Sequence, residues 1–226
     1  MKDLKNKKVL ITGGARGIGK QIALEFARQG ADIIICDSDK SFFNKTEFKK
    51  NRKEIEDIGA SCYGFYLDVT KYEDIIRERR SILDLVGKID VLVNNAGVVF
   101  GGNFLEVPIE KHRLTYDVNT YGIINMLHVF LQDLIDQPTA HIVNISSASG
   151  FVPLPGGSTY ASSKAAVTSL SESLNIELKR EGNQHVGMTI VCPGYVQTGM
   201  FDGVKGPILV PILTPEKLAK KIVKAV

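Results

Sequence analysis

The sequence of 226 residues contains no apolar run as long as the roughly 18 residues that a membrane-spanning helix needs. Its charge is nearly balanced, with 28 basic and 25 acidic side chains, and no basic block is interleaved with aromatic residues, so a nucleic-acid partner is not expected. Repeats, low-complexity tracts and linker-like segments are also absent, while 44% of the residues are hydrophobic. These features exclude global disorder and predict one domain over residues 1–226.

Cysteine is scarce, and the candidate metal ligands are scattered. Cys36, Cys62 and Cys192 are odd in number, widely spaced and set in apolar stretches, which indicates reduced core residues and not a disulfide framework. None of the four histidines has the spacing or the acidic companions of a metal ligand, so no metal site is expected. The lysine-rich start is not followed by an apolar stretch typical of a secretion signal. We therefore expect a cytoplasmic protein.

Short apolar runs alternate with long amphipathic stretches along the chain. The runs expected to form strands are 9–12, 33–36, 61–66, 91–93, 141–145 and 188–192. The stretches expected to form helices are 17–29, 44–58, 71–86, 107–136 and 158–181. Because the strand runs are almost wholly apolar, the alternation predicts a doubly wound parallel sheet of the Rossmann type, an α/β fold with helices on both faces. Ligands of such sheets bind at the carboxyl ends of the strands.

A glycine-rich turn follows the first predicted strand. Gly13, Gly17 and Gly19 allow a sharp turn, close approach to a diphosphate and tight packing of the next helix. The N-terminus of that helix offers unpaired N–H groups to a phosphate, so Arg16 and Ile18 are also cofactor-binding candidates. The spacing G-x-x-x-G-x-G differs from the common G-x-G-x-x-G fingerprint, and no Gly-Lys-Ser/Thr indicates a P-loop. On this motif alone, a turn that binds no ligand remains an alternative.

An acidic residue ends the second predicted strand and bears on the choice of cofactor. Asp37 could accept hydrogen bonds from an adenosine ribose, whereas a 2′-phosphate there would meet a like charge, at a cost on the order of 4 kcal/mol before screening. Arg16 favours the opposite outcome, because a guanidinium in the glycine-rich turn could grip a 2′-phosphate. Since Asp37 is the closer group in this topology, we expect NAD, with NADP as the alternative.

Later strand ends add small and polar residues suited to a cofactor. Asp68 and Val69 follow the third predicted strand, where an adenine ring would lie. Asn95, Ala96 and Gly97 follow the fourth. Each of these groups taken alone is more often a turn signal, so they count only in combination with the glycine-rich turn.

A serine, a tyrosine and a lysine are the catalytic candidates. Ser147 follows the fifth predicted strand, and Tyr160 and Lys164 lie one turn apart on the next helix. A tyrosine ordinarily loses its proton at about pH 10, but an adjacent ammonium and an oxidised nicotinamide favour the phenolate and lower the pKa of the phenol. Ser147 could hydrogen-bond the substrate oxygen while hydride passes to or from the cofactor. The alternative is a surface Tyr/Lys pair, which the added serine and glycine-rich turn make the weaker interpretation.

In combination, these motifs resemble those of the short-chain dehydrogenase/reductase family, from about residue 7 to the end of the sequence. The resemblance implies that Tyr160 is the general acid/base, that Lys164 lowers its pKa and binds the nicotinamide ribose, and that Ser147 orients the reacting oxygen. It also implies that Asn119 holds a water in a proton relay to Lys164. The residues implied to border the nicotinamide are Pro193, Gly194, Val196 and Thr198.

The segments 190–193, 198–203 and 211–216 resemble those of retinol dehydrogenases and related hydroxysteroid dehydrogenases, which oxidise lipophilic alcohols, often with NAD. Those proteins usually begin with a hydrophobic anchor, which this sequence does not show. The expected function is therefore hydride transfer between NAD(H) and a lipophilic or secondary alcohol. The alternatives are an NADPH-dependent reductase of a 3-oxoacyl thioester or another carbonyl, and a cofactor-binding regulator without turnover.

An apolar segment at about 199–213 is expected to form a lid over the substrate, followed by a lysine-rich helix that starts at Pro215. A less favoured alternative places the lid and the lysines against an anionic lipid surface. The family's seventh strand would follow that helix, within which the sequence ends. Because the family's tetramer uses that region, we expect a homodimer through the helices near 107–136 and 158–181.

Overall fold

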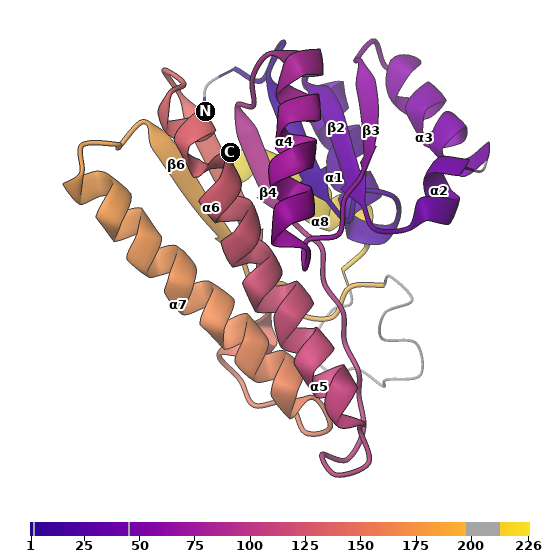
Figure 1. Ribbon diagram of the computed structural model, residues 1–226, viewed down its shortest axis with the longest axis vertical. Helices are drawn as coiled ribbons and strands as arrows, with labels where there is room; N and C mark the ends of the chain where they lie inside the picture. The colour runs from indigo at the N-terminus through magenta and orange to yellow at the C-terminus, as the bar shows by residue number, and fades with distance from the viewer. Residues whose placement is uncertain (2, 45, 198–212) are drawn as a thin grey trace.

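The computed structural model describes residues 1, 3–44, 46–197 and 213–226, in which six parallel strands form one sheet between two helical layers (Figure 1). The strands are β1 (Lys8–Thr12), β2 (Asp32–Asp37), β3 (Cys62–Tyr66), β4 (Val91–Asn94), β5 (Ala140–Ile145) and β6 (Val186–Val191). The helices are α1 (Gly17–Arg28), α2 (Lys40–Asn44), α3 (Thr46–Glu56), α4 (Tyr72–Val86), α5 (Ile109–Tyr116), α6 (Gly122–Ile135), α7 (Ser158–Arg180) and α8 (Pro215–Ala225). The order β3-β2-β1-β4-β5-β6 confirms the predicted doubly wound sheet.

Alternate strand residues supply two separate cores, one on each face of the sheet. Val9 and Ile11 of β1 belong to a cluster covered by α1, α3 and α8. Leu10, between them, belongs to a second cluster covered by α4, α6 and α7. Because successive side chains of a strand point to opposite faces, the almost wholly apolar strand sequences follow directly from this burial on both sides.

One predicted helix has a neighbour that was not predicted, and another is divided in the structure. The stretch 44–58 corresponds to α3, and the unpredicted short helix α2 precedes it, with its Phe42 and Phe43 rings packed on Phe48 of α3. The stretch 107–136 is interrupted by a π-helical turn at Asp117–Tyr121, which separates α5 from α6. Such turns widen a helix locally, and this one directs Asn119 into the interior, where it is fully buried.

The predicted helix that starts at Pro215 is confirmed. The Thr214 hydroxyl caps α8 by accepting a hydrogen bond from the Lys217 N–H, and the buried face of the helix carries Leu218 and Ile222. Its lysines are exposed. Of the predicted lid, residues 199–212 lie outside the described residues, as does Thr198, so that prediction stays untested. None of the described helices is long and apolar enough to cross a membrane.

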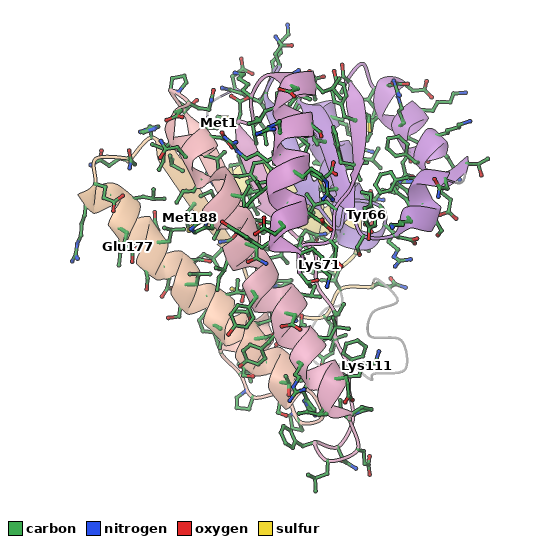
Figure 2. The ribbon with its side chains drawn as sticks, in the orientation of Figure 1. Met1, Tyr66, Lys71, Lys111, Glu177 and Met188 are labelled. Carbon is green, nitrogen blue, oxygen red and sulfur yellow. The ribbon has the colours of Figure 1, made fainter. Side chains whose placement is uncertain are left out.

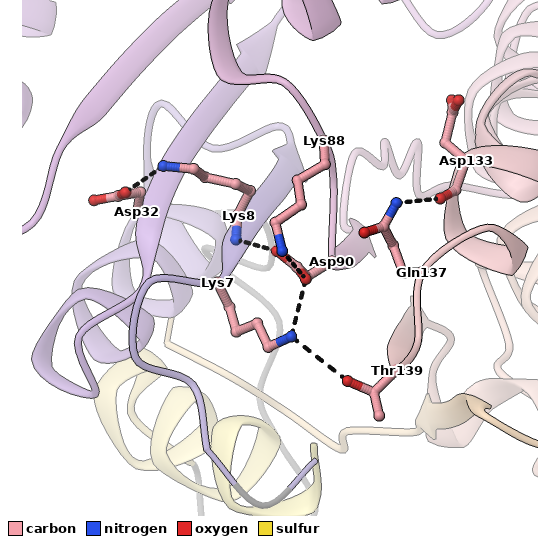
Figure 3. Close-up of polar contacts among 8 residues, drawn as sticks. All are labelled: Lys7, Lys8, Asp32, Lys88, Asp90, Asp133, Gln137 and Thr139. Atoms are coloured by element: carbon pink, nitrogen blue, oxygen red, sulfur yellow. Dashed lines mark hydrogen bonds and ion pairs between the residues drawn. The ribbon is translucent and has the colours of Figure 1, made fainter.

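The amino ends of the strands are fixed by a charge cluster around Asp90, which precedes β4 (Figure 3). Its buried carboxylate accepts hydrogen bonds from the Lys7 and Lys88 amines at 3.0 and 3.1 Å and from the Lys8 N–H at 2.9 Å. The Lys8 amine pairs with Asp32 at the start of β2. Burial alone would raise the pKa of Asp90, but these donors hold the pKa below its ordinary value. The cluster therefore fixes the starts of β1, β2 and β4.

A buried histidine lies within the sheet itself. His141 of β5 is 8% exposed, and its Nε2 lies 2.8 Å from the Thr189 hydroxyl on β6. Burial, with a smaller contribution from the N-terminal ammonium, lowers the pKa of His141 to about 4. The folded protein therefore holds this imidazole neutral at a pH where an unfolded chain would protonate it.

We expect His141 to make the protein acid-sensitive. The stabilisation by the neutral imidazole is complete above the unfolded pKa near 6.5 and is lost as the pH falls toward the folded pKa of about 4, in total on the order of 3 kcal/mol. Urea unfolding between pH 7 and 4.5 should therefore show a steeper loss of stability in the wild type than in His141→Gln. The exposed His128→Gln serves as the matched control. Parallel losses in wild type and His141→Gln would contradict the assignment.

Candidate functional site

A cleft of about 650 Å³ opens at the carboxyl ends of the strands. Tyr66, the last residue of β3, lies at this edge of the sheet, and Lys111 lies on α5 beyond it (Figure 2). The predicted site residues that line the cleft are Gly13, Arg16, Gly17, Ile18, Asp37, Asp68, Val69, Asn95, Ala96, Gly97, Ser147, Tyr160, Lys164, Pro193, Gly194 and Val196. The fold thus brings together segments that are far apart in the sequence, as the rule for parallel sheets predicts.

The glycine-rich turn fits closely against the neighbouring strand end and against itself. A Cβ added to Gly13, whose φ is 63°, would lie 3.0 Å from the Cα of Ala96. A Cβ added to Gly19 would lie 2.2 Å from the Gly13 carbonyl oxygen, so Gly19 packs beneath the turn and does not line the cleft. By contrast, a Cβ added to Gly17 would meet no atom within 4 Å, which leaves the cleft side open. This bare backbone is suited to the close approach of a diphosphate.

Asn95 and Thr12 join the end of β4 to the glycine-rich turn. The Asn95 amide donates hydrogen bonds to the Thr12 and Gly13 carbonyl oxygens, each at 3.0 Å. In return, the Thr12 hydroxyl accepts from the Asn95 and Ala96 N–H groups at 3.0 and 3.1 Å. Asn95 therefore shapes the cleft as well as lining it. Thr12 was not a predicted site residue, although its place at the end of β1, directly before the glycines, is a signal that could have identified it.

Asp37 and Arg16 lie where the ribose of a dinucleotide is expected. The Asp37 carboxylate accepts hydrogen bonds from the Ala15 and Asp39 N–H groups, both at 3.1 Å, which fixes its orientation. The Arg16 side chain is 86% exposed, and its nearest carboxylate is that of Asp39, at 4.0 Å. No acidic residue lies in the first turn of α1, so the N–H groups of Gly17 and Ile18 carry no competing anion. These residues fit a bound dinucleotide.

The adenine side of the cleft is set by two local contacts. The Asp68 carboxylate accepts from the Thr70 N–H and hydroxyl, which closes a turn after β3. The Asn125 amide of α6 donates to the Val69 carbonyl oxygen at 2.9 Å. Asp68 therefore has a structural task in addition to its place in the cleft wall.

Ser147, Tyr160 and Lys164 form one wall of the cleft, and each is at most 8% exposed. The Lys164 amine lies 5.8 Å from the centre of the Tyr160 ring and donates a hydrogen bond to the Ile145 carbonyl oxygen at 2.8 Å. The Tyr160 and Ser147 side chains are joined by a hydrogen bond. The sequence therefore identifies three side chains that the fold places together.

The pKa values in this wall differ from the expectation. Burial raises the pKa of Tyr160, and the hydrogen bond from Ser147 offsets this only in part. Burial also lowers the pKa of Lys164 to about 8, against a small opposing influence of Cys192. The predicted lowering of the tyrosine pKa by its neighbour is therefore wrong for the protein alone. Desolvation disfavours both charged forms, and the Lys164 amine donates one of its hydrogen bonds to a backbone carbonyl.

Ser149, which sequence reasoning missed, sets the direction of the Ser147 hydroxyl. The Ser149 N–H and hydroxyl donate to the Ser147 oxygen at 3.2 and 2.9 Å, and Ser147 thereby caps the 3₁₀ turn Ala148–Gly150. Because two donors occupy the acceptor positions of this oxygen, its own hydrogen is left to be donated toward Tyr160 or a substrate. The signal was present in the sequence, since a serine two residues after another commonly bonds back to it.

Asn119 lies behind the cleft wall and does not line it. Its amide donates to the Val98 carbonyl oxygen at 2.9 Å and to the Ser163 hydroxyl at 3.1 Å, and its oxygen accepts from the Val98 N–H at 2.8 Å. A Cβ added to Gly97 would lie 3.3 Å from the Asn119 oxygen and 3.6 Å from the Lys164 amine, so the two side chains flank this glycine. The expected water relay stays a prediction.

The rest of the cleft wall is mainly apolar and was not predicted. Its further lining residues are Ser38, Leu67, Val98, Val99, Phe100, Val118, Ile145 and Ser146. Periodicity cannot separate such residues from core positions, because the apolar side chains that follow β4 look like a continued buried run. Together with the polar wall, they make a cleft that can hold an elongated ligand with an apolar end.

A parallel sheet with this glycine-rich turn and with a buried Ser/Tyr/Lys wall defines a class of protein, the nicotinamide-dependent dehydrogenases and reductases. A profile of the short chain dehydrogenase family matches residues 7–206. The chain is 35% identical over 227 residues to epidermal retinol dehydrogenase 2 of Mus musculus, an alignment that covers 100% of this chain and 72% of the relative. The chain belongs to the short-chain dehydrogenase/reductase family, as the motifs indicated.

Solved structures give the same result. A short chain dehydrogenase/reductase of Burkholderia phymatum in complex with NAD is 28% identical, with a TM-score of 0.82 over 100% of this chain and 81% of that chain. An alcohol dehydrogenase of Thermococcus sibiricus complexed with 5-hydroxy-NADP is 26% identical, with a TM-score of 0.83 over 97% and 89% of the two chains. The protein is an NAD(P)-dependent oxidoreductase of the short-chain type.

Proposed function

We propose that the protein oxidises a lipophilic or secondary alcohol with NAD, and that Tyr160 exchanges a proton with the substrate oxygen. The observation that carries this proposal is the buried wall of Ser147, Tyr160 and Lys164, which faces the same cleft as the apolar residues that follow β4. A reacting oxygen can lie against this wall while an apolar body lies against Val98 and Phe100. The 35% identity to a protein named as a retinol dehydrogenase supports the same substrate class.

Proton transfer follows from the geometry of the wall. When bound in the cleft, the nicotinamide supplies the chemistry of hydride transfer to or from the carbinol carbon. Burial raises the pKa of Tyr160, so the phenol holds its proton at neutral pH and can donate it to a carbonyl oxygen in the reductive direction. In the oxidative direction the phenolate accepts the hydroxyl proton, and positive charge beside it, including that of Lys164, favours this form. Ser147 directs its hydrogen to the reacting oxygen.

The choice of cofactor depends on charge at the end of β2. The oriented Asp37 carboxylate, with Asp39 nearby, disfavours a 2′-phosphate. Arg16, the residue that favours NADP, is exposed and lies nearer to Asp39 than to any other carboxylate. These contacts support NAD as the preferred cofactor.

A substrate panel tests the proposed function. Retinoid, steroid, short secondary alcohol and acetoacetyl-thioester substrates are compared with each nicotinamide cofactor at the NADH absorbance. We expect the highest kcat/KM with NAD and a retinoid or steroid alcohol, because the cleft wall is mainly apolar. Turnover confined to the thioester with NADPH would instead support the carbonyl reductase alternative, and no turnover at all would support a regulator.

Tyr160→Phe should retain NADH binding and lower the turnover number by about 10²–10⁴-fold, because it removes the group that carries the proton. Binding is measured by titration of NADH fluorescence and turnover at saturating cofactor. Tyr72→Phe, on α4 and outside the residues that line the cleft, is the control and should leave both values unchanged. An unaffected rate in Tyr160→Phe would reject the assigned role.

Asp37→Ser should raise the use of NADP relative to NAD by about tenfold or more, because the like charge that disfavours a 2′-phosphate is removed. The kcat/KM values for the two cofactors are compared on one alcohol. Since the Asp37 carboxylate also accepts a hydrogen bond from the Ala15 N–H, the midpoint of thermal unfolding is measured in parallel to separate an effect on specificity from one on stability. Asp57→Ser, an exposed position after α3, should leave the preference as it is.

We also propose that the chain forms a homodimer through α6 and α7. Exposed apolar side chains on or beside these helices, Tyr121 (56%), Ile124 (37%) and Ile176 (51%), support this assignment. Sedimentation equilibrium at micromolar concentration should give a dimer mass. Ile176→Glu should shift the distribution toward monomer. The same dimer mass for the wild type and for Ile176→Glu would argue against this interface.

A further inference from the structure

Helix α3 buries a polar side chain where an amphipathic helix would ordinarily place an apolar one. Asn51 and Ile55 are its two buried residues, and Asn51 is only 6% exposed. A buried amide is unfavourable unless it is hydrogen-bonded, so the partner of Asn51 identifies its task. Its Nδ2 donates to the carbonyl oxygen of Ala15 at 2.8 Å, within the glycine-rich turn. The direction of this bond is unambiguous, because a carbonyl oxygen can only accept.

Ala15 is held from a second side as well. Its N–H donates to the Asp37 carboxylate at 3.1 Å, so both backbone polar groups of Ala15 are bonded to side chains of other elements. The peptide that carries the Ala15 carbonyl continues into Arg16, which occupies the N-cap position of α1 without a side-chain capping bond, and α1 begins at Gly17. The orientation of this carbonyl therefore helps to set the direction of the first N–H groups of α1, which face the cleft.

Next to this anchored peptide, the turn is open on its cleft side. Gly17 has a φ of 57°, and no atom lies within 4 Å of a Cβ built on it. Glycine-rich backbone loses much conformational freedom when it is ordered, so an anchor that orders it in advance lowers the cost of binding. We propose that Asn51 is a positioning residue for the dinucleotide, which acts by fixing the Ala15 carbonyl of the glycine-rich turn. The inference rests on the proposed role of this turn and of Asp37 in cofactor binding.

Helix α3 is anchored independently of Asn51. The Lys20 amine of α1 pairs with Glu54 of α3 at 2.8 Å, and the Phe48 ring packs so closely on β3 that a Cβ added to Gly64 would lie 2.4 Å from it. Loss of the Asn51 amide should therefore leave α3 in place. This independence also supplies a matched control, since Glu54→Gln weakens the attachment of the same helix without touching the turn.

The test measures cofactor binding in the absence of alcohol. Asn51→Ala removes the amide, and Asn51→Asp at pH 8 keeps the shape while replacing the donor with a carboxylate that repels the carbonyl oxygen. We expect the Kd for NADH, from fluorescence titration, and the KM for NAD to rise by about tenfold in both variants. The turnover number at saturating NAD and the KM for the alcohol should change less than about twofold. Glu54→Gln should bind NADH as the wild type does.

A second measurement reports the turn directly. Amide hydrogen exchange of residues 13–19 in the protein without cofactor should be faster in Asn51→Ala than in wild type or in Glu54→Gln. An unchanged Kd in a folded Asn51 variant would overturn the proposal, as would equal losses of binding and thermal stability in Asn51→Ala and Glu54→Gln. Failure of the wild type to bind NADH would instead reject the proposed cofactor site. Because the titration contains no alcohol, an error in the substrate class affects neither outcome.

Discussion

The junction between β1 and β4 is the feature on which the site depends. The strand order reverses here, so the loops that follow the two strands diverge and leave a crevice. Thr12 and Asn95 hold the two strand ends together by reciprocal hydrogen bonds, in which each side chain satisfies backbone groups of the other segment. The glycine-rich turn, the adenine side and the Ser/Tyr/Lys wall are all placed relative to this junction. A loss here would displace both halves of the cleft at once.

Burial moves the two ionisable groups of the cleft wall in opposite directions. It raises the pKa of Tyr160 and lowers that of Lys164 to about 8, so it disfavours the charged form of both groups. The same desolvation strengthens the electrostatic interaction of both groups with any charged ligand that binds in the cleft, because water screens such interactions only weakly there. The site is therefore poised to respond to charge, and its protonation state is a joint property of protein and ligands.

The sequence predicts the sheet and most of the cleft because both depend on local patterns. Apolar runs reveal strands buried on both faces, and residues just beyond them must gather at one edge, which accounts for Asp37, Asn95 and Ser147. What it does not reveal depends on contacts between distant segments. The π-helical turn that buries Asn119, the bond from Asn51 to Ala15 and the pKa of Tyr160 follow from burial and long-range partners, which periodicity does not encode.

The charge cluster around Asp90 lies at the opposite end of the strands from the cleft. Energetic effects of well-separated sites are usually additive, so substitutions in the cleft wall should not change the contribution of the charge cluster around Asp90 to stability. A laboratory-evolution library could therefore randomise apolar wall positions such as Val99 or Val118 to redirect substrate choice. The charge cluster would keep its full contribution to folding stability, so the fold should tolerate substitutions that change substrate specificity.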